Sequence, residues 1–174
     1  GKSLGNGYPI SAIVGNKNIM KLMNEVFVSG TFAGETLSMA AALATLNKLE
    51  KIKVPQKLSK LGKKLKKASN AIINNLDLLK FYEFTGNDWW PRLSIKNTNQ
   101  TLLLHLARQE FVKNGIFMGS SFNLCLAHNN DLIFKKSIKS LEKAFINLKN
   151  ILEKKNPSRY LKGSKLENIF AVRG

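Results

Sequence analysis

Two stretches of the chain carry apolar residues at spacings of three and four, the period of an amphipathic α-helix. The first spans residues 56–76, with Pro55 suited to its first turn, and the second spans residues 131–153 after two asparagines that can cap it. Lysines fill the other faces of the first helix, which we expect to lie on a core at the protein surface. The residues expected on the two core faces are Leu58, Leu61, Leu65, Ala68, Ile72 and Leu76, then Leu132, Ile138, Leu141, Phe145, Leu148 and Leu152.

Shorter patterns predict the remaining elements. Residues 35–51 are alanine-rich and predict a helix that packs closely through Leu37, Ala40, Ala41, Ala44 and Leu49. Residues 102–113 predict another helix, closed by Asn114-Gly115. A turn at residues 86–88 separates two predicted strands, and short apolar runs predict further strands at residues 10–14, 26–28, 116–118 and 124–127. The order indicates a partial α/β region, a long linking helix and a compact α+β unit.

Composition limits the possible function classes. The chain has 174 residues, 44% of them hydrophobic, which is enough for a folded core. No apolar run approaches the length of a membrane span. The single cysteine, Cys125, excludes an internal disulfide and fits a cytoplasmic location, and we interpret it as a small core residue.

The net charge of +17 comes mainly from lysine, because only four of the 28 basic residues are arginines. Proteins that read bases or clamp phosphates rely more on the planar guanidinium of arginine. We therefore expect these lysines on solvated helix faces, with no nucleic-acid or membrane partner. A basic module that binds nucleic acid or acidic surfaces through residues 57–67 remains an alternative.

One candidate site is the segment Gly1-Lys2-Ser3-Leu4-Gly5-Asn6-Gly7. A lysine ε-amine forms a Schiff base with an aldehyde when it is deprotonated and held in place. The glycines allow a sharp turn and a close approach to a bound group. Taken alone, a Gly-Lys followed by glycines is a weak signal, because most such loops are structural or hold phosphate without covalent chemistry.

A second candidate site is the segment Ser29-Gly30-Thr31-Phe32-Ala33-Gly34, which precedes the alanine-rich helix. It offers a backbone N–H, a hydroxyl and a nearby helix N-terminus, which together suit a phosphate. Ordinary N-capping of the helix is the alternative.

Together these segments resemble the class-III pyridoxal-phosphate (PLP) aminotransferases, in the branch of glutamate-1-semialdehyde 2,1-aminomutase. The resemblance rests on Lys2 followed by Ser3-Leu4-Gly5-Asn6-Gly7-Tyr8-Pro9-Ile10-Ser11-Ala12, and on Gly30-Thr31-x-x-Gly34 before Met39-Ala40-Ala41. Residues 115–121 and 126–128 resemble the small domain of that branch. The implied fold is α/β, the aspartate-aminotransferase-like PLP fold type I. Residues 1–53 would end the large domain, 54–80 would form a linking helix, 81–156 the small domain and 157–174 a tail.

The resemblance also implies site residues. Lys2 would form the Schiff base with pyridoxal 5'-phosphate and then move a proton during amino transfer. Gly30 and Thr31 would contact the cofactor phosphate of a neighbouring subunit, which implies a homodimer with shared active sites. His105 and His128 inherit no role and are expected to be structural, and no metal is expected. Arg92, after Trp89-Trp90-Pro91, could meet a substrate carboxylate or begin a packed edge strand.

The implied reaction is transfer of an amino group between an amine or amino acid and an aldehyde or keto acid. Intramolecular transfer by an aminomutase is the alternative, although the turn at residues 119–123 lacks the glutamate that aminomutases of the branch carry. The family's phosphate loop, cofactor-stacking aromatic ring and acidic partner of the pyridine nitrogen should precede Lys2. We therefore expect this chain to be a C-terminal part that is inactive alone, and an inactive fragment is a further alternative.

Overall fold

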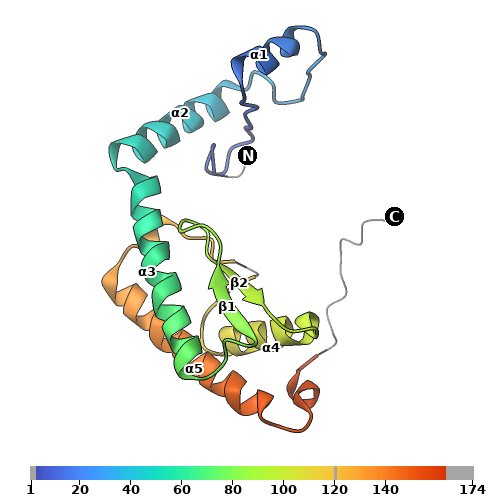
Figure 1. Ribbon diagram of the computed structural model, residues 1–174. Coiled ribbons are helices and arrows are strands. Elements are labelled where there is room, and N and C mark those ends of the chain that lie inside the picture. Colours follow the sequence, from blue (N-terminus) through green and yellow to red (C-terminus); the bar gives the residue numbers. More distant parts are fainter. Residues whose placement is uncertain (1–2, 120, 164–174) are drawn as a thin grey trace. The chain divides into compact units, whose positions relative to one another are not determined.

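The computed structural model describes residues 3–119 and 121–163 (Figure 1). The chain divides into two compact units, Gly1–Val54 and Pro55–Gly174. The first contains α1 (Lys17–Met20), the 3-10 turn Lys21–Asn24 and α2 (Thr36–Lys51). The second contains α3 (Val54–Asn75, which starts at the boundary), β1 (Tyr82–Thr85), β2 (Arg92–Ile95), α4 (Gln100–Lys113) and α5 (Asp131–Leu152), with 3-10 turns at Leu126–His128 and Pro157–Tyr160.

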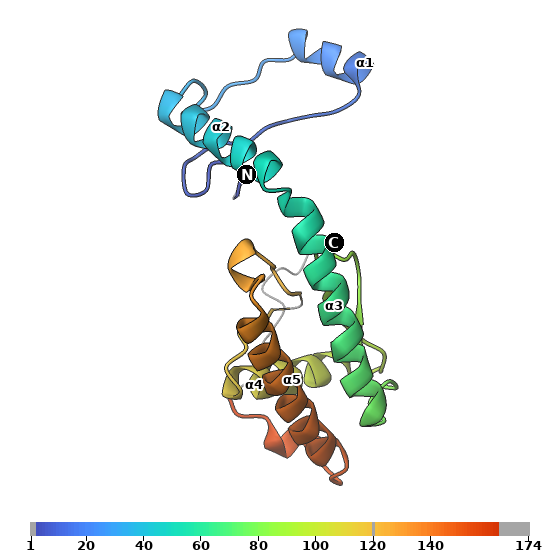
Figure 2. The same cartoon turned by 90° about the vertical axis from the view of Figure 1, so that its left-hand side faces the viewer.

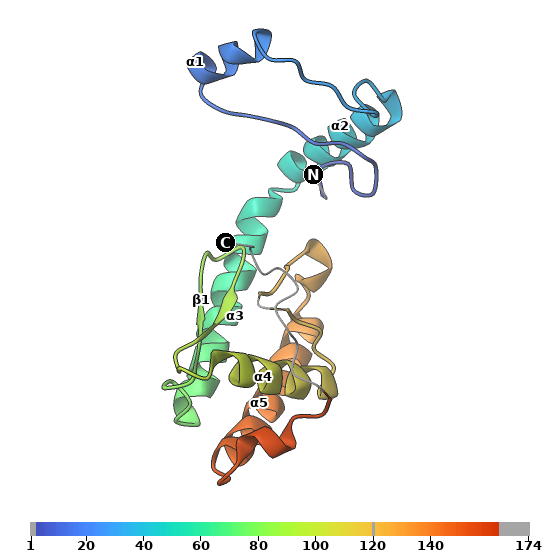
Figure 3. The same cartoon turned by 90° about the vertical axis from the view of Figure 1, so that its right-hand side faces the viewer.

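The second unit is built around an antiparallel hairpin. Strands β1 and β2 pair from Tyr82 opposite Ile95 to Thr85 opposite Arg92. Figures 2 and 3 show α4 and α5 on the same side of this hairpin. The core between them is aromatic, because the ring of Phe145 lies 5.4–6.3 Å from those of Tyr82, Phe84 and Phe111. The predicted hairpin and the predicted helix at residues 102–113 are confirmed.

Helix α3 has the predicted apolar stripe. Leu61 and Leu65 are buried, and Ile72 and Leu76 pack against the core of the second unit. The expectation of a surface helix with its stripe on a core is therefore confirmed. Pro55 lies in the first turn, where its missing N–H costs no hydrogen bond.

Helix α5 also follows its pattern, with one exception. Leu141, Phe145 and Leu148 are fully buried, and the Asn130 side chain caps the helix by accepting hydrogen bonds from the N–H groups of Leu132 and Ile133. The expectation that Leu132 faces the core is wrong, since its side chain is 76% exposed. Leu132 lies in the first turn of α5, before the residues that pack on the hairpin.

Gly62 lets the turn of the hairpin approach α3. A Cβ at this position would lie 1.6 Å from the carbonyl oxygen of Asp88. The same contact is held by Lys66, whose Nζ lies 2.8 Å from the Asp88 carboxylate and donates to the carbonyl of Gly86 at 2.7 Å. Backbone therefore packs directly against backbone here.

Replacing Gly62 by alanine is expected to lower the free energy of unfolding, by about 1–3 kcal/mol, because the turn must move away. In an ordinary helix the same change gains about 1 kcal/mol, so the sign of the effect tests the contact. Urea unfolding measures it. Gly119→Ala is the control, since a Cβ there meets nothing within 4 Å; a stabilised Gly62→Ala variant would contradict the packing.

Four predicted strands are wrong. Residues 10–14, 26–28, 116–118 and 124–127 are not strands, and residues 126–128 form a 3-10 turn. A strand needs a neighbour to accept its backbone hydrogen bonds. Among the described residues before α3 no strand is present, and the loop after α4 has only a single bridge, from Ser121 to Arg92.

The packed face of α2 also differs from the expectation. Within the first unit the buried residues of α2 are Ser38 and Ala42. Leu37 on the predicted face is 57% exposed, and Met39, Leu43 and Leu46 are exposed as well. The first unit thus leaves most of the apolar surface of α2 uncovered.

The buried His105 on α4 makes the stability depend on pH. Burial, and then the nearby charge of Arg108, lower the pKa of His105 below its ordinary value of about 6.5. Well above pH 6.5, His105 is neutral in both the folded and the unfolded chain. As the pH falls below 6.5, His105 is protonated first in the unfolded chain. The free energy of unfolding should therefore fall as the pH drops below 6.5, by at most about 1.4 kcal/mol per pH unit.

Urea unfolding at pH 7.5 and 5.5 measures this, and His105→Gln should remove the part of the fall that His105 causes. His128→Gln is the matched control, because His128 is exposed and is the only other histidine. The buried Glu110 titrates in a lower window. Burial raises the pKa of Glu110, but hydrogen bonds from Lys113, Gln109 and Asn147 outweigh burial and hold it below about 4.5. If the free energy of unfolding fell equally in the wild type and in His105→Gln between pH 7.5 and 5.5, His105 would not be the cause of the fall.

Candidate functional site

The first part of the site is a tight glycine turn that follows Lys2. The N–H of Tyr8 donates to the carbonyl of Gly5 at 3.2 Å, and the N–H of Ile10 donates to that of Tyr8 at 3.0 Å. A Cβ on Gly5 would lie 2.6 Å from the Tyr8 carbonyl oxygen, and Gly7 has a φ of +117°. Both positions therefore require glycine. The predicted Lys2 itself lies outside the described residues.

The second part is the turn before α2. Gly30 accepts a hydrogen bond from the N–H of Ala33 at 3.0 Å, and Phe32 accepts one from Glu35 at 3.2 Å. Gly30 and Thr31 are exposed. The turn therefore presents the Thr31 backbone and side chain to solvent.

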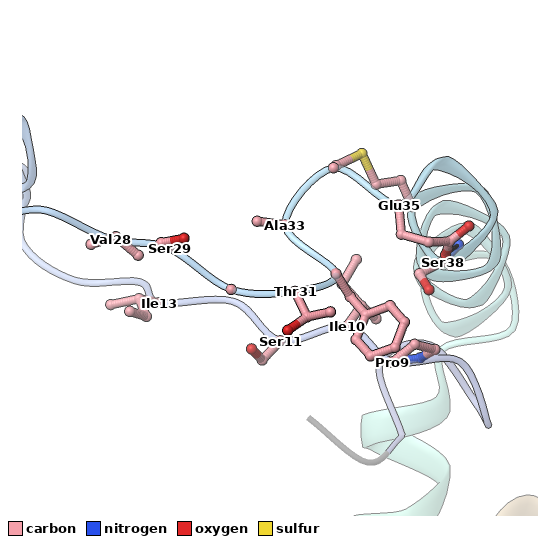
Figure 4. A pocket seen from close by; sticks show the side chains of 14 residues that line it. Pro9, Ile10, Ser11, Ile13, Val28, Ser29, Thr31, Ala33, Glu35 and Ser38 are labelled. Carbon is pink, nitrogen blue, oxygen red and sulfur yellow. Dashed lines mark hydrogen bonds between the residues drawn. The ribbon is translucent and has the colours of Figure 1, made fainter.

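A pocket of about 740 Å³ joins the two parts (Figure 4). Residues 9–11 and Ile13 line it together with residues 28–35, Ser38 and Met39. Figure 4 shows Thr31 beside the segment that carries Ile10 and Ser11. Among the described residues, the hydroxyls of Ser11, Ser29 and Thr31 have no hydrogen-bond partner, so three donors remain available to a ligand.

Glu35 closes the N-terminus of α2. Its carboxylate accepts hydrogen bonds from the N–H of Leu37 at 2.9 Å and from that of Ser38 at 2.5 Å. The Ser38 hydroxyl and then the Ser38 N–H lower the pKa of Glu35, which keeps the cap ionised. Helix α2 is thus N-capped by Glu35, while the role of Gly30 and Thr31 stays a prediction. An anion would have to be held by the turn at Gly30 and Thr31, because a carboxylate already occupies the helix N-terminus.

The described residues fit one end of a phosphorylated ligand. The pocket volume falls in the usual range for small-molecule sites, about 300–1,000 Å³. Thr31 combines a free hydroxyl with an exposed turn backbone, and Ser11 and Ser29 add hydroxyls that the sequence reasoning did not single out. In the sequence, the available signal for Ser11 and Ser29 was their position beside the two motifs. Among the described residues no group of three or more His, Cys, Asp or Glu side chains could hold a metal ion.

The other residues considered from the sequence lie in the second unit. Arg92 begins β2, as the edge-strand interpretation expected, and its guanidinium lies 5.5 Å from the centre of the Trp90 ring. His105 is buried on α4. Cys125 is exposed, so the expectation of a core residue is wrong. None of the described helices is long and apolar enough to span a membrane.

Comparison with known proteins supports a single family. Residues 1–80 match the family described as Aminotransferase class-III. A glutamate-1-semialdehyde 2,1-aminomutase of Hyperthermus butylicus is 29% identical over 86% of this chain and 38% of its own length. A 3-aminobutyryl-CoA aminotransferase of Cloacimonas acidaminovorans is 24% identical over 87% of this chain and 37% of its own length.

A solved structure agrees with the sequence match. The FumI protein of Sphingopyxis sp. MTA144, solved in its PLP internal aldimine form, superposes with a TM-score of 0.69 at 22% identity, over 93% of this chain and 39% of that protein. This confirms the predicted fold class, that of part of a fold type I PLP-dependent enzyme. The chain spans less than two-fifths of the length of these relatives. The division of residues between large and small domains stays a prediction. Residues 1–80 of this chain match the class-III aminotransferase family, which confirms the resemblance seen in the sequence.

Proposed function

We propose that the full protein containing this chain is a PLP-dependent aminotransferase that moves an amino group between an amine or amino acid and an aldehyde or keto acid. The observation that carries the proposal is Lys2 in front of the Gly5–Gly7 turn, inside the segment that matches the family. When bound, PLP supplies an electron sink that stabilises negative charge on the substrate carbon. We place the enzyme in the cytoplasm, where the exposed thiol of Cys125 stays reduced.

Lys2 has two tasks in this proposal. Its ε-amine would hold the cofactor, and the same amine would move a proton at the substrate carbon. The turn at Gly5 and Gly7 fixes the backbone directly after Lys2, because neither position accepts a side chain.

Gly30 and Thr31 bind the cofactor phosphate of a neighbouring subunit in this proposal, which requires a homodimer. The exposed apolar side chains of the first unit support an interface, since large uncovered apolar surfaces mark contact sites. Phe27 is 94% exposed, Phe32 60% and Leu43 61%. Light scattering of the full protein measures the oligomeric state; a monomer that binds PLP would refute the shared site.

Intramolecular transfer is a second candidate, because several relatives are aminomutases. The described loop around Ser121 and Asn123 contains no acidic residue, which favours transfer between two molecules. Consumption of glutamate-1-semialdehyde without any amino acceptor would establish the aminomutase instead.

The test uses the full protein incubated with PLP, reduced with borohydride and digested. Mass spectrometry should find the pyridoxyl group on the peptide that contains Lys2. A folded dimer that carries no label on this peptide would refute the proposal, and would leave a degenerate relative or a basic binding module. The basic binding module predicts a steep loss of affinity for nucleic acid as salt rises.

Replacing Thr31 by valine is expected to weaken PLP binding by about 10–100-fold, because a hydrogen bond to a charged phosphate is worth about 1.5–3 kcal/mol. Titration of the apoenzyme with PLP, followed by absorbance, measures the change. The control is Thr36→Val, also exposed but in the first turn of α2 after the Glu35 cap. Equal affinities for the two variants would contradict the phosphate contact.

A further inference from the structure

The second unit contains a pocket of its own, with a volume of about 400 Å³. It lies between α3, the loop after α4 and the first half of α5. Its volume suits a small molecule. The walls are mostly apolar and include Leu61, Leu65, Phe122, Leu124, Phe134 and Leu141.

The loop side of the pocket carries two oriented donors. The indole N–H of Trp90 donates to the hydroxyl oxygen of Ser121 at 2.9 Å and to the amide oxygen of Asn123 at 3.2 Å. The hydroxyl oxygen of Ser121 and the amide oxygen of Asn123 therefore both accept a hydrogen bond from Trp90. The Ser121 hydroxyl hydrogen and the Asn123 amide hydrogens remain to be donated.

His128 adds a third donor. Its Nδ1 accepts a hydrogen bond from the N–H of Cys125 at 3.0 Å, and the ring lines the pocket. A neutral imidazole that accepts through Nδ1 carries its hydrogen on Nε2. Among the described residues Nε2 has no partner. Three side chains on the pocket wall therefore offer hydrogens, and their partner on a ligand must be an acceptor.

The charges around the pocket favour a negative acceptor. None of the described lining residues is acidic. The Lys64 ammonium lies 4.1 Å from the centre of the Phe134 ring, which forms part of the wall. Asp131 lies 3.6 Å from the same ammonium but is largely exposed, so it offsets that charge only weakly. The chain as a whole carries +17.

We propose that this pocket binds a monocarboxylate with an apolar body, a medium-chain fatty acid or an arylalkanoic acid. The carboxylate accepts hydrogen bonds from Ser121, Asn123 and His128, and the hydrocarbon part displaces water from the wall of Leu61, Leu65 and Phe134. The site needs only residues of the second unit and does not depend on the proposed function.

Octanoate is the probe, titrated into the full protein in a Trp89→Phe background so that Trp90 is the only tryptophan of residues 1–174. Binding should saturate at one octanoate per chain by calorimetry and change the Trp90 emission, because Trp90 holds Ser121 and Asn123. Octan-1-ol, with the same chain and no charge, should bind at least about 10-fold more weakly.

Asn123→Leu should weaken octanoate binding about 10-fold, whereas Asn150→Leu, on the exposed face of α5, should leave it unchanged. Ser137→Leu, which fills the pocket, should abolish binding while circular dichroism shows an intact fold, so the proposal stays testable if Asn123→Leu misfolds. Equal affinity for octanoate and octan-1-ol, or full binding by Ser137→Leu, would overturn the proposal.

Discussion

Replacing Lys2 by alanine is expected to abolish covalent PLP and to lower the rate of amino transfer by about 10²–10⁴-fold. The factor is the usual contribution of a positioned acid–base group, and loss of the covalent anchor adds to it. Absorbance of the bound cofactor and single-turnover rates with an amino donor measure the two effects separately. A Lys2→Ala variant that still reacts at the wild-type rate would place the catalytic amine elsewhere.

The control for this change is Lys17→Ala, in the same unit. Lys17 is exposed at the start of α1 and touches no part of the pocket that carries Thr31. It should keep both the cofactor and the rate. If Lys17→Ala lost activity as well, the effect would come from the folding of the first unit and not from the chemistry of Lys2.

Replacing Phe145 by alanine is expected to lower the free energy of unfolding by about 3–5 kcal/mol. The side chain is fully buried and its ring contacts Tyr82, Phe84 and Phe111. Removing the ring leaves a cavity between α5, α4 and the hairpin. These elements pack against one another in the same core, so they cannot move together far enough to fill the cavity. Urea unfolding followed by circular dichroism measures the loss, which is a large share of the stability of a single domain.

Phe117 provides a matched control, since its side chain is 99% exposed. Phe117→Ala should change the free energy of unfolding by no more than about 0.5 kcal/mol. Similar losses for the two phenylalanines would mean that the core of the second unit lies elsewhere.

Pattern and propensity predicted the elements whose structure is decided locally. The stripes of α3 and α5 and the turn at Gly86 produced the expected helices and hairpin. A helix satisfies its own backbone hydrogen bonds, so its period can be read from neighbouring residues. The motifs around Lys2 and Gly30-Thr31 were enough to suggest the class-III aminotransferase family, which residues 1–80 match.

Other features depend on segments that are distant in the sequence. The runs at residues 10–14 and 124–127 have strand-like composition, yet they form no strand because the described chain offers them no partner. The position of Glu35 just before α2 suggests an N-cap. The composition of residues 29–35 alone did not distinguish a helix N-terminus capped by Glu35 from one that is open to a bound anion. The pocket of Ser121, Asn123 and His128 depends on the loop after α4, which is held to the hairpin by hydrogen bonds from Trp90 and by the bridge between Arg92 and Ser121.

The sequence by itself therefore predicted the family that residues 1–80 match, the lysine to be tested and the helices and hairpin of the second unit. Only the tertiary structure decided which face of α2 is covered, why residue 62 must be glycine and where Leu132 lies. The physical reason is that periodicity shows which side of a helix is apolar, whereas the burial of that side depends on which other elements pack against the helix. At Gly62 the decisive atom is the carbonyl of Asp88, 26 positions away in the chain.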